Sequence, residues 1–350
     1  MPAVRPALLP TILLSALLAG TSPAPGQQAP AVVVSVAPLH GITAAVMAGA
    51  GEPDLLIDGG QSPHTFTMRP SQAAMLQSAD LVVWGGRLLE STLERPLESL
   101  VPAEARFSVL DAPGLLLLEA RGGGVWASHE HDLAPHDDDD GHHDQDDHEA
   151  HSDEHDHDEA HDHDDEHDHS EDHAGDDHGA TDAHLWLDPD NAVAIARAIA
   201  ERLAEIDPAN ADIYRANAER FSDETAVLTA DLTERLSALA DRPFIVFHDA
   251  YQYLETRFDL DAAGSIAVSP DSQPSASRIV EIQDTITARG ALCLFAEPQF
   301  EPTIVESIAG DTGVRTGILD PVGGDLALGP GHYERLMRGL ADGLEDCLGD

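Results

Sequence analysis

The sequence of 350 residues contains no lysine. All 18 of its basic residues are arginines, against 65 Asp and Glu, so the formal net charge is −47. A chain of this sign repels phosphate backbones and anionic lipid headgroups, which excludes nucleic acids and anionic membrane surfaces as primary partners. Cations are the natural complement of such a protein.

Long hydrophobic runs are also absent. The apolar stretch 8–18 is too short to cross a bilayer as a permanent anchor. Arg5 precedes it and a segment rich in small residues, 19–26, follows it, which is typical of an export signal. We therefore predict a signal peptide over residues 1–26 and a mature protein that is soluble in the periplasm.

Cysteine is scarce, with only two residues in the chain, which excludes a small disulfide-rich scaffold. In an exported protein, one disulfide between Cys293 and Cys347 is the expected state. Two buried free thiols are the alternative. Zinc binding by the pair is disfavoured because no Cys-x-x-Cys spacing is present.

The acidic residues concentrate in one segment. Between His129 and His178 lie 24 acidic residues, 15 histidines and no arginine. A segment with almost no apolar residues cannot form a core, so we predict a disordered insertion over 127–180. Its His-Asp repeats offer interchangeable donors for several weakly bound metal ions, while a solvated charged linker is the alternative. The accessory metal-binding histidines would be His142, His143, His148, His151, His155, His157, His161, His163, His167 and His169.

The rest of the chain alternates short β-branched runs with helical patterns, which is typical of α/β folds. We expect an N-terminal α/β lobe over 30–207, a linking helix over 208–240 and a C-terminal α/β lobe over 241–350, with mainly parallel sheets. The expected strands are 31–36, 55–57, 81–84, 107–110, 115–118, 244–247, 263–267, 293–296 and 315–318. The expected helices are 39–47, 70–78, 87–100, 191–206, 250–258, 275–289, 302–310 and 333–347.

Only five histidines lie outside the insertion, and three of them follow predicted strands or lie in loops at the carboxyl edge of a sheet: His64, His184 and His248. Ligands of open α/β folds collect at that edge. Three imidazoles from two lobes could enclose one Zn²⁺ and leave a fourth position for water or a carboxylate. Of the other two, we expect His40 to make a local contact and His332 to lie at the surface.

The same residues resemble the metal-binding cluster of periplasmic solute-binding proteins that serve ABC importers, and most closely the zinc-uptake proteins of the ZnuA type. The resemblance runs from about Val32 to Cys347. It implies two pseudo-symmetric lobes joined by a rigid helix, with His64, His184 and His248 as zinc ligands. It rests on the segments SPHTF (62–66), RPS (69–71), ADLVVW (79–84), HLWLDP (184–189), VFHDAY (246–251), FAEPQF (295–300) and LDP (319–321).

The fourth ligand stays open. Some zinc members carry a Glu before the first histidine, but this chain has Pro63, which cannot coordinate through its side chain. Water is the first choice, Asp320 the second, and a group from the insertion the third. Asp249 could orient a ligand imidazole or cap the following helix, and Glu297 could line the cleft or hold the lobe interface.

We therefore predict a monomeric zinc-binding protein that delivers Zn²⁺ to an ABC membrane permease, without catalytic activity. A manganese-type protein or a metal-responsive adhesin of the same family is the alternative, although three histidines favour zinc. A zinc hydrolase would need a general base beside the metal, and no His-Glu-x-x-His motif is present.

Overall fold

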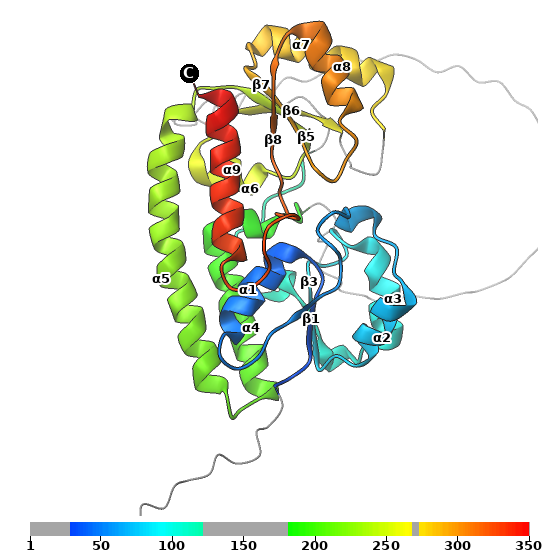
Figure 1. Ribbon diagram of the computed structural model, residues 1–350, viewed down its shortest axis with the longest axis vertical. Helices are drawn as coiled ribbons and strands as arrows, with labels where there is room; N and C mark the ends of the chain where they lie inside the picture. Colours follow the sequence, from blue (N-terminus) through cyan, green and yellow to red (C-terminus); the bar gives the residue numbers. More distant parts are fainter. Residues whose placement is uncertain (1–28, 122–180, 268–272, 350) are drawn as a thin grey trace, which may run out of the picture.

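A computed structural model describes residues 29–121, 181–267 and 273–349. Two four-stranded parallel sheets lie at opposite ends of the molecule, and long helices run along one side of both (Figure 1). The fold class is therefore the expected one, two α/β lobes. The predicted signal peptide and the predicted insertion both lie outside the described residues.

The first sheet has the strand order β2-β1-β3-β4, with all neighbours parallel. Its central strands are valine-rich and buried on both faces, as a parallel sheet requires. The strands are β1 (Val32–Val34), β2 (Asp54–Leu55), β3 (Leu81–Trp84) and β4 (Arg106–Ser108), and the accompanying helices are α1 (Ala37–Met47), α2 (Pro70–Gln77) and α3 (Glu94–Leu100).

The second sheet has the order β6-β5-β7-β8 and is also parallel throughout. Counted along the chain, both sheets thus have the same order, 2-1-3-4, so each lobe repeats one topology. The strands are β5 (Phe244–His248), β6 (Ala262–Ala267), β7 (Cys293–Ala296) and β8 (Arg315–Ile318), and the helices are α6 (Gln252–Phe258), α7 (Ala276–Arg289), α8 (Thr303–Thr312) and α9 (His332–Leu348).

Two consecutive helices, α4 (Pro189–Ile206) and α5 (Ala211–Leu236), join the lobes. The 26 residues of α5 make it about 39 Å long, so it passes both sheets (Figure 1). It begins later than the expected linking helix, because Asp207 to Asn210 turn the chain, and a 3-10 turn follows it at Ser237–Leu239. Buried side chains of α1, α4, α5 and α9 connect both sheets in one apolar cluster.

The structure departs most from the expected elements at one helix and one strand of the first lobe. The helix expected over 87–100 begins only at Glu94, because the buried Glu90 side chain turns inward and accepts a hydrogen bond from the Gly85 amide at 2.9 Å. The strand expected over 115–118 does not form. Side chains replace a strand partner there: Asn191 bonds both the amide and the carbonyl of Leu116.

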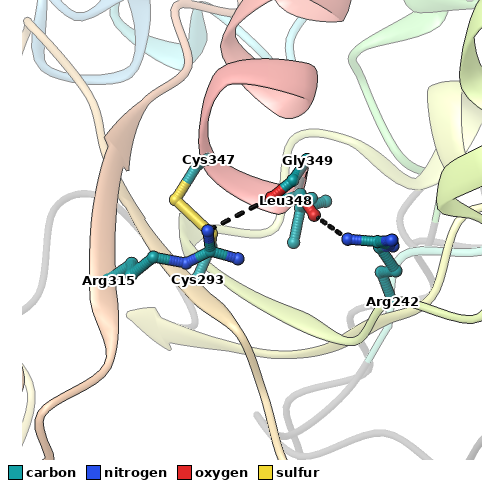
Figure 2. The surroundings of a disulfide bond; sticks show 6 residues. All are labelled: Arg242, Cys293, Arg315, Cys347, Leu348 and Gly349. Atoms are coloured by element: carbon teal, nitrogen blue, oxygen red, sulfur yellow. Dashed lines mark hydrogen bonds between the residues drawn. A yellow bond between two sulfur atoms is a disulfide. The ribbon is translucent and has the colours of Figure 1, made fainter.

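The disulfide forms as expected. Cys293 of β7 and Cys347 of α9 are bonded, with 6.1 Å between their Cα atoms (Figure 2). The bond ties the last helix to a core strand across 54 residues of sequence. Beside it, Arg315 donates to the carbonyl of Gly349 at 3.2 Å, and Arg242 to that of Leu348 at 2.5 Å (Figure 2). These arginines satisfy carbonyls that the end of a helix leaves unpaired.

Within residues 29–121, 181–267 and 273–349, no helix is both long enough and apolar enough to cross a bilayer.

Candidate metal centre

Three separate segments carry the central histidines. His248 is the last residue of β5, at the carboxyl edge of the second sheet. His184 immediately precedes a 3-10 turn, Leu185–Leu187, that leads into α4. His64 lies within another 3-10 turn, Pro63–Thr65, which Pro63 begins after the two-residue strand β2. One histidine thus ends a strand, one lies in a 3-10 turn and one directly precedes such a turn.

The structure brings these three side chains together. One ligand nitrogen from each of His64, His184 and His248 lies within 4.8 Å of the others. The imidazole centroids are 5.3 Å apart for His184 and His248, 5.5 Å for His64 and His184, and 5.8 Å for His64 and His248. The three rings therefore surround a common point.

Two carboxylates fix the orientation of two of these rings. Asp182 Oδ1 lies 2.8 Å from His184 Nδ1, and Glu297 Oε1 lies 2.7 Å from His248 Nδ1. The same oxygens also accept the backbone amides of the histidines they orient, at 3.0 and 3.2 Å. Because an ionised carboxylate only accepts, the proton of each neutral imidazole resides on Nδ1.

This tautomer leaves the Nε2 atoms of His184 and His248 without a proton in the neutral rings. His184 Nε2 and His248 Nε2 lie 3.4 Å apart. With the Nδ1 atoms protonated, the Nε2 atoms of two neutral rings both carry lone pairs, and their repulsion at this distance is relieved either by a proton on one Nε2 or by a metal cation that binds both. Histidine that donates Nδ1–H to a carboxylate and offers Nε2 to a metal is the usual arrangement in metal sites.

The third histidine is in a different electrostatic state. Burial, and then the nearby charges of His184 and His248, lower the pKa of His64 to about 2. Its Nε2 is buried and has no hydrogen-bond partner in the described part of the chain. Burial would lower the pKa of His248 as well, but the charge of Glu297 and its hydrogen bond outweigh this, so that pKa is raised. His64 is therefore neutral and available as a ligand.

The space between the rings is small. A cavity of about 10 Å³ lies among the three histidines, and Pro63, Phe300 and Val322 form part of its wall. This is about the volume that one water molecule needs. The cavity thus suits a single small ion, and an organic substrate does not fit.

Each of the three histidine-bearing segments also carries a buried aromatic residue. Phe66, Trp186 and Tyr251 are all at most 3 % exposed. Trp186 Nε1 donates to the Pro321 carbonyl at 2.8 Å, which joins the His184 turn to the loop after β8. The three aromatic residues thus pack as parts of the core.

The structure does not bring Asp320 into the histidine cluster. Its carboxylate accepts the Gln299 side chain at 2.8 Å and the amides of Val322 and Gly324 at 3.1 and 2.7 Å. In the described residues, the group that could hold a metal consists of the three histidines alone. Asp320 here stabilises the loop that borders the site.

The other sequence expectations had mixed outcomes. Glu297 does contact His248, whereas the carboxylate of Asp249 binds Arg121. His40 makes the expected local contact, with Nε2 3.0 Å from the Pro53 carbonyl. His332 is not at the surface: it is 0 % exposed, and its Nε2 lies 3.0 Å from the Gly323 carbonyl. The first residue of α9 is buried because it packs under the loop that borders the site.

Sequence reasoning missed Asp182 and Arg121. Both flank the predicted insertion, so Asp182 looked like the last of its acidic residues. One signal was available: Asp182 lies two residues before His184, and in an extended segment residues i and i+2 share a face.

Comparison with known proteins agrees with this geometry. The family model described as "Zinc-uptake complex component A periplasmic" matches residues 32–347. The chain belongs to this family. The ZnuA high-affinity zinc uptake system proteins of Brucella abortus (strain 2308) and Paracoccus denitrificans (strain Pd 1222) are 45 % and 42 % identical to it. The alignment with the Brucella protein covers 91 % of this chain and 91 % of that protein. The alignment with the Paracoccus protein covers 97 % of this chain and 98 % of that protein.

Solved structures agree on the fold. A crystal structure of ZnuA superposes with a TM-score of 0.67 at 22 % identity, covering 92 % of this chain and 100 % of that one. The family description names a periplasmic component of the zinc-uptake complex, and the ZnuA crystal structure has the same fold as this chain.

Proposed function

We propose that His64, His184 and His248 bind one Zn²⁺ as cargo, which this periplasmic protein captures and delivers to the membrane permease of an ABC importer. The observation that carries the proposal is the pair of Nε2 atoms 3.4 Å apart, each on a ring whose Nδ1 donates to a buried carboxylate. Such rings present their lone pairs to a common cation. His64 supplies the third nitrogen.

Zinc is the cation that these donors favour. Imidazole nitrogen suits Zn²⁺, whereas Mn²⁺ prefers sites with more carboxylate oxygen. Asp182 and Glu297, the carboxylates nearest the rings, are both directed at Nδ1 atoms, and Asp320 is bound within its own loop. The fourth position of a tetrahedral site would then be filled by water.

The proposal excludes catalysis. A zinc hydrolase needs an open substrate pocket and a general base beside the metal-bound water. The cavity of about 10 Å³ admits no organic substrate, and the nearby carboxylates already accept hydrogen bonds from imidazoles or amides. We further propose that the protein is a monomer, exported by a signal peptide over 1–26, and that the histidines of 127–180 form an accessory collector of lower affinity.

Competitive titration tests this function. The mature protein, purified without a His-tag, is titrated with Zn²⁺ against a chelator of known affinity, alongside a variant lacking residues 130–180. Both should bind about one tight zinc, and the deletion should lose only weaker ions. Loss of the tight ion on deletion would move the transport site into the insertion. A second titration with Mn²⁺ should give much weaker binding, and equal affinity for the two metals would overturn the choice of zinc.

A further inference from the structure

An arginine joins the two segments that carry His184 and His248. The guanidinium of Arg121 donates to both oxygens of Asp249, through Nε at 3.0 Å and through Nη2, and to both oxygens of Glu255 at 2.8 and 3.1 Å. The three side chains are nearly buried, at 15 %, 12 % and 2 % exposure. One guanidinium thus binds two carboxylates in the fork geometry that lysine cannot reproduce.

Both carboxylates belong to the His248 segment. Asp249 directly follows His248 at the end of β5, and Glu255 lies in the first turn of α6. Arg121 therefore holds the chain where it leaves the strand that presents His248. Any movement of Arg121 relative to α6 would be transmitted to the residue next to this ligand.

At its other end, Arg121 belongs to the segment that supports His184. Leu118 accepts the Asp182 amide at 2.8 Å, and Glu119 pairs with Thr181 as an isolated antiparallel bridge. Tyr253 of α6 reinforces this pairing, since its hydroxyl contacts the Leu118 amide and the Asp182 carbonyl, each at 3.1 Å. The strand-like pair thus formed presents Asp182, which orients His184.

Charge makes this connection costly to break. The Asp249 and Glu255 side chains are only 12 % and 2 % exposed, so the guanidinium of Arg121 replaces much of the hydration that both carboxylates lose on burial. Removing the guanidinium would leave two buried carboxylates without their partner, which is among the more damaging changes a buried ion pair can suffer. The segment would have to rearrange, and both ligand-bearing chains would move with it.

We propose that Arg121 is a positioning residue of the metal site: it fixes the separation of His184 and His248 by clamping the segments that carry them, and so slows the release of bound zinc. The inference rests on the proposed function, because it takes these histidines as ligands. Arg121 itself contacts no ligand nitrogen. It acts on the positions of the two segments, while Asp182 and Glu297 orient the imidazole rings of His184 and His248.

The test compares three substitutions in the full mature chain: Arg121→Gln, which keeps hydrogen bonding but removes the charge, Arg121→Lys, and Arg235→Gln as a matched control. Arg235 also binds two carboxylates, Asp342 and Glu345, but between α5 and α9, away from the site. Zinc affinity is measured by chelator competition, release by chelator-triggered dissociation, and ligand geometry by the visible spectrum of the Co²⁺-loaded protein.

We expect Arg121→Gln to weaken zinc binding about 10–100-fold, as removal of an outer support of a metal site does, mostly through faster dissociation, and to alter the Co²⁺ spectrum. Arg121→Lys should fall between this variant and the wild type. Arg235→Gln should lower thermal stability while its affinity stays within about twofold of the wild type. Unchanged affinity and spectrum in Arg121→Gln, or an equal loss of affinity in Arg235→Gln, would overturn the inference.

Should Arg121→Gln not fold, Glu255→Gln removes one arm of the clamp while keeping the side-chain size. It should accelerate zinc release about 3–10-fold, a smaller loss than for an outer-sphere group that contacts a ligand, and an unchanged rate would equally overturn the inference. His248→Ala separates this result from failure of the proposed function. If His248→Ala loses tight zinc while the clamp variants do not, only the positioning role is wrong; if His248→Ala keeps tight zinc, the site assignment itself is wrong.

Discussion

The two sides of the metal centre are built differently. His184 and His248 come from segments that strand pairing, carboxylates and the Arg121 clamp hold in place. His64 comes from a 3-10 turn after a two-residue strand, and its buried Nε2 finds no hydrogen-bond partner among the described residues. The first side is preorganised before metal binds, whereas the second completes the site. Because His64 is the least buried of the three histidines, we expect zinc to enter and leave past it.

The two sheets show the same contrast. The strands of the second sheet have 4–6 residues, and a separate apolar cluster under α7 and α8 supports its outer face. The strands of the first sheet have 2–4 residues. Although both sheets share one strand order, more residues are paired between strands in the sheet that carries His248. A short strand leaves more of the chain in loops, and His64 lies in such a loop.

The largest expected effect comes from replacing the histidines. Each of His64→Ala, His184→Ala and His248→Ala should weaken zinc binding by more than the 10–100-fold typical of outer groups. Stability of the metal-free protein should separate them: His184→Ala and His248→Ala each remove the imidazole partner of a buried carboxylate and leave it only the backbone amide, at a cost of about 1–3 kcal/mol, whereas His64→Ala removes no such partner. Chelator competition and thermal unfolding measure both. An equal loss of stability in all three variants would contradict the contrast between the two sides.

The next effect concerns the carboxylates that orient the rings. Asp182→Asn and Glu297→Gln should each lower zinc affinity about 10–100-fold, because the imidazole loses a charged acceptor and becomes a weaker donor. Asp207→Asn is the matched control, since Asp207 is 2 % exposed and accepts from Tyr214 at 2.7 Å, outside the metal centre. It should change stability only. Competitive titration checks all three variants, and an affinity loss in Asp207→Asn would show that the effect is not local.

Acid should weaken binding in a way that also distinguishes the two sides. Protons compete with zinc for the histidines. The pKa of His248 is raised, so this residue takes up a proton as the pH falls through that value and affinity falls with it, whereas His64, with a pKa of about 2, stays neutral above roughly pH 3. A plot of the logarithm of zinc affinity against pH would have a slope of three if all three histidines released a proton on binding zinc. We expect a slope below three. Titrations between pH 5 and 8 measure the slope, and a value of three would show that His64 competes for protons as well.

Much of this architecture could be predicted from the sequence. The strand starting at Leu81 and the one starting at Cys293 have the predicted bounds, because short β-branched or apolar runs between turns permit little else. The three histidines that cluster were singled out because they remained after the insertion was set aside and followed predicted strands or lay in loops at a sheet edge, and the resemblance to ZnuA-type proteins pointed to the same three. Asp182, Arg121 and the burial of His332 were not predicted, since each depends on which distant segment packs beside it.

The smallest expected effect tests the loop that carries His64. Gly59 lies against Gly324 so closely that a Cβ at position 59 would come within 2.3 Å of the Gly324 Cα. Gln299 contacts the same place, with Nε2 3.4 Å from the Gly59 carbonyl. The loop before His64 therefore rests on the loop after β8. We expect that Gly59→Ala pushes these loops apart and moves His64 away from the other two histidines.

Gly60→Ala is the matched control for this change, because a Cβ at position 60 meets no atom within 4 Å. Gly59→Ala should weaken zinc binding about 3–10-fold, or about 0.6–1.4 kcal/mol, chiefly through faster release. Gly60→Ala should leave affinity and release unchanged. Stopped-flow transfer of zinc to a chelator measures both variants. Since His184 and His248 keep their carboxylates, Gly59→Ala should not lower the stability of the metal-free protein by as much as His248→Ala does. Release at the wild-type rate in Gly59→Ala would mean that zinc does not leave past His64.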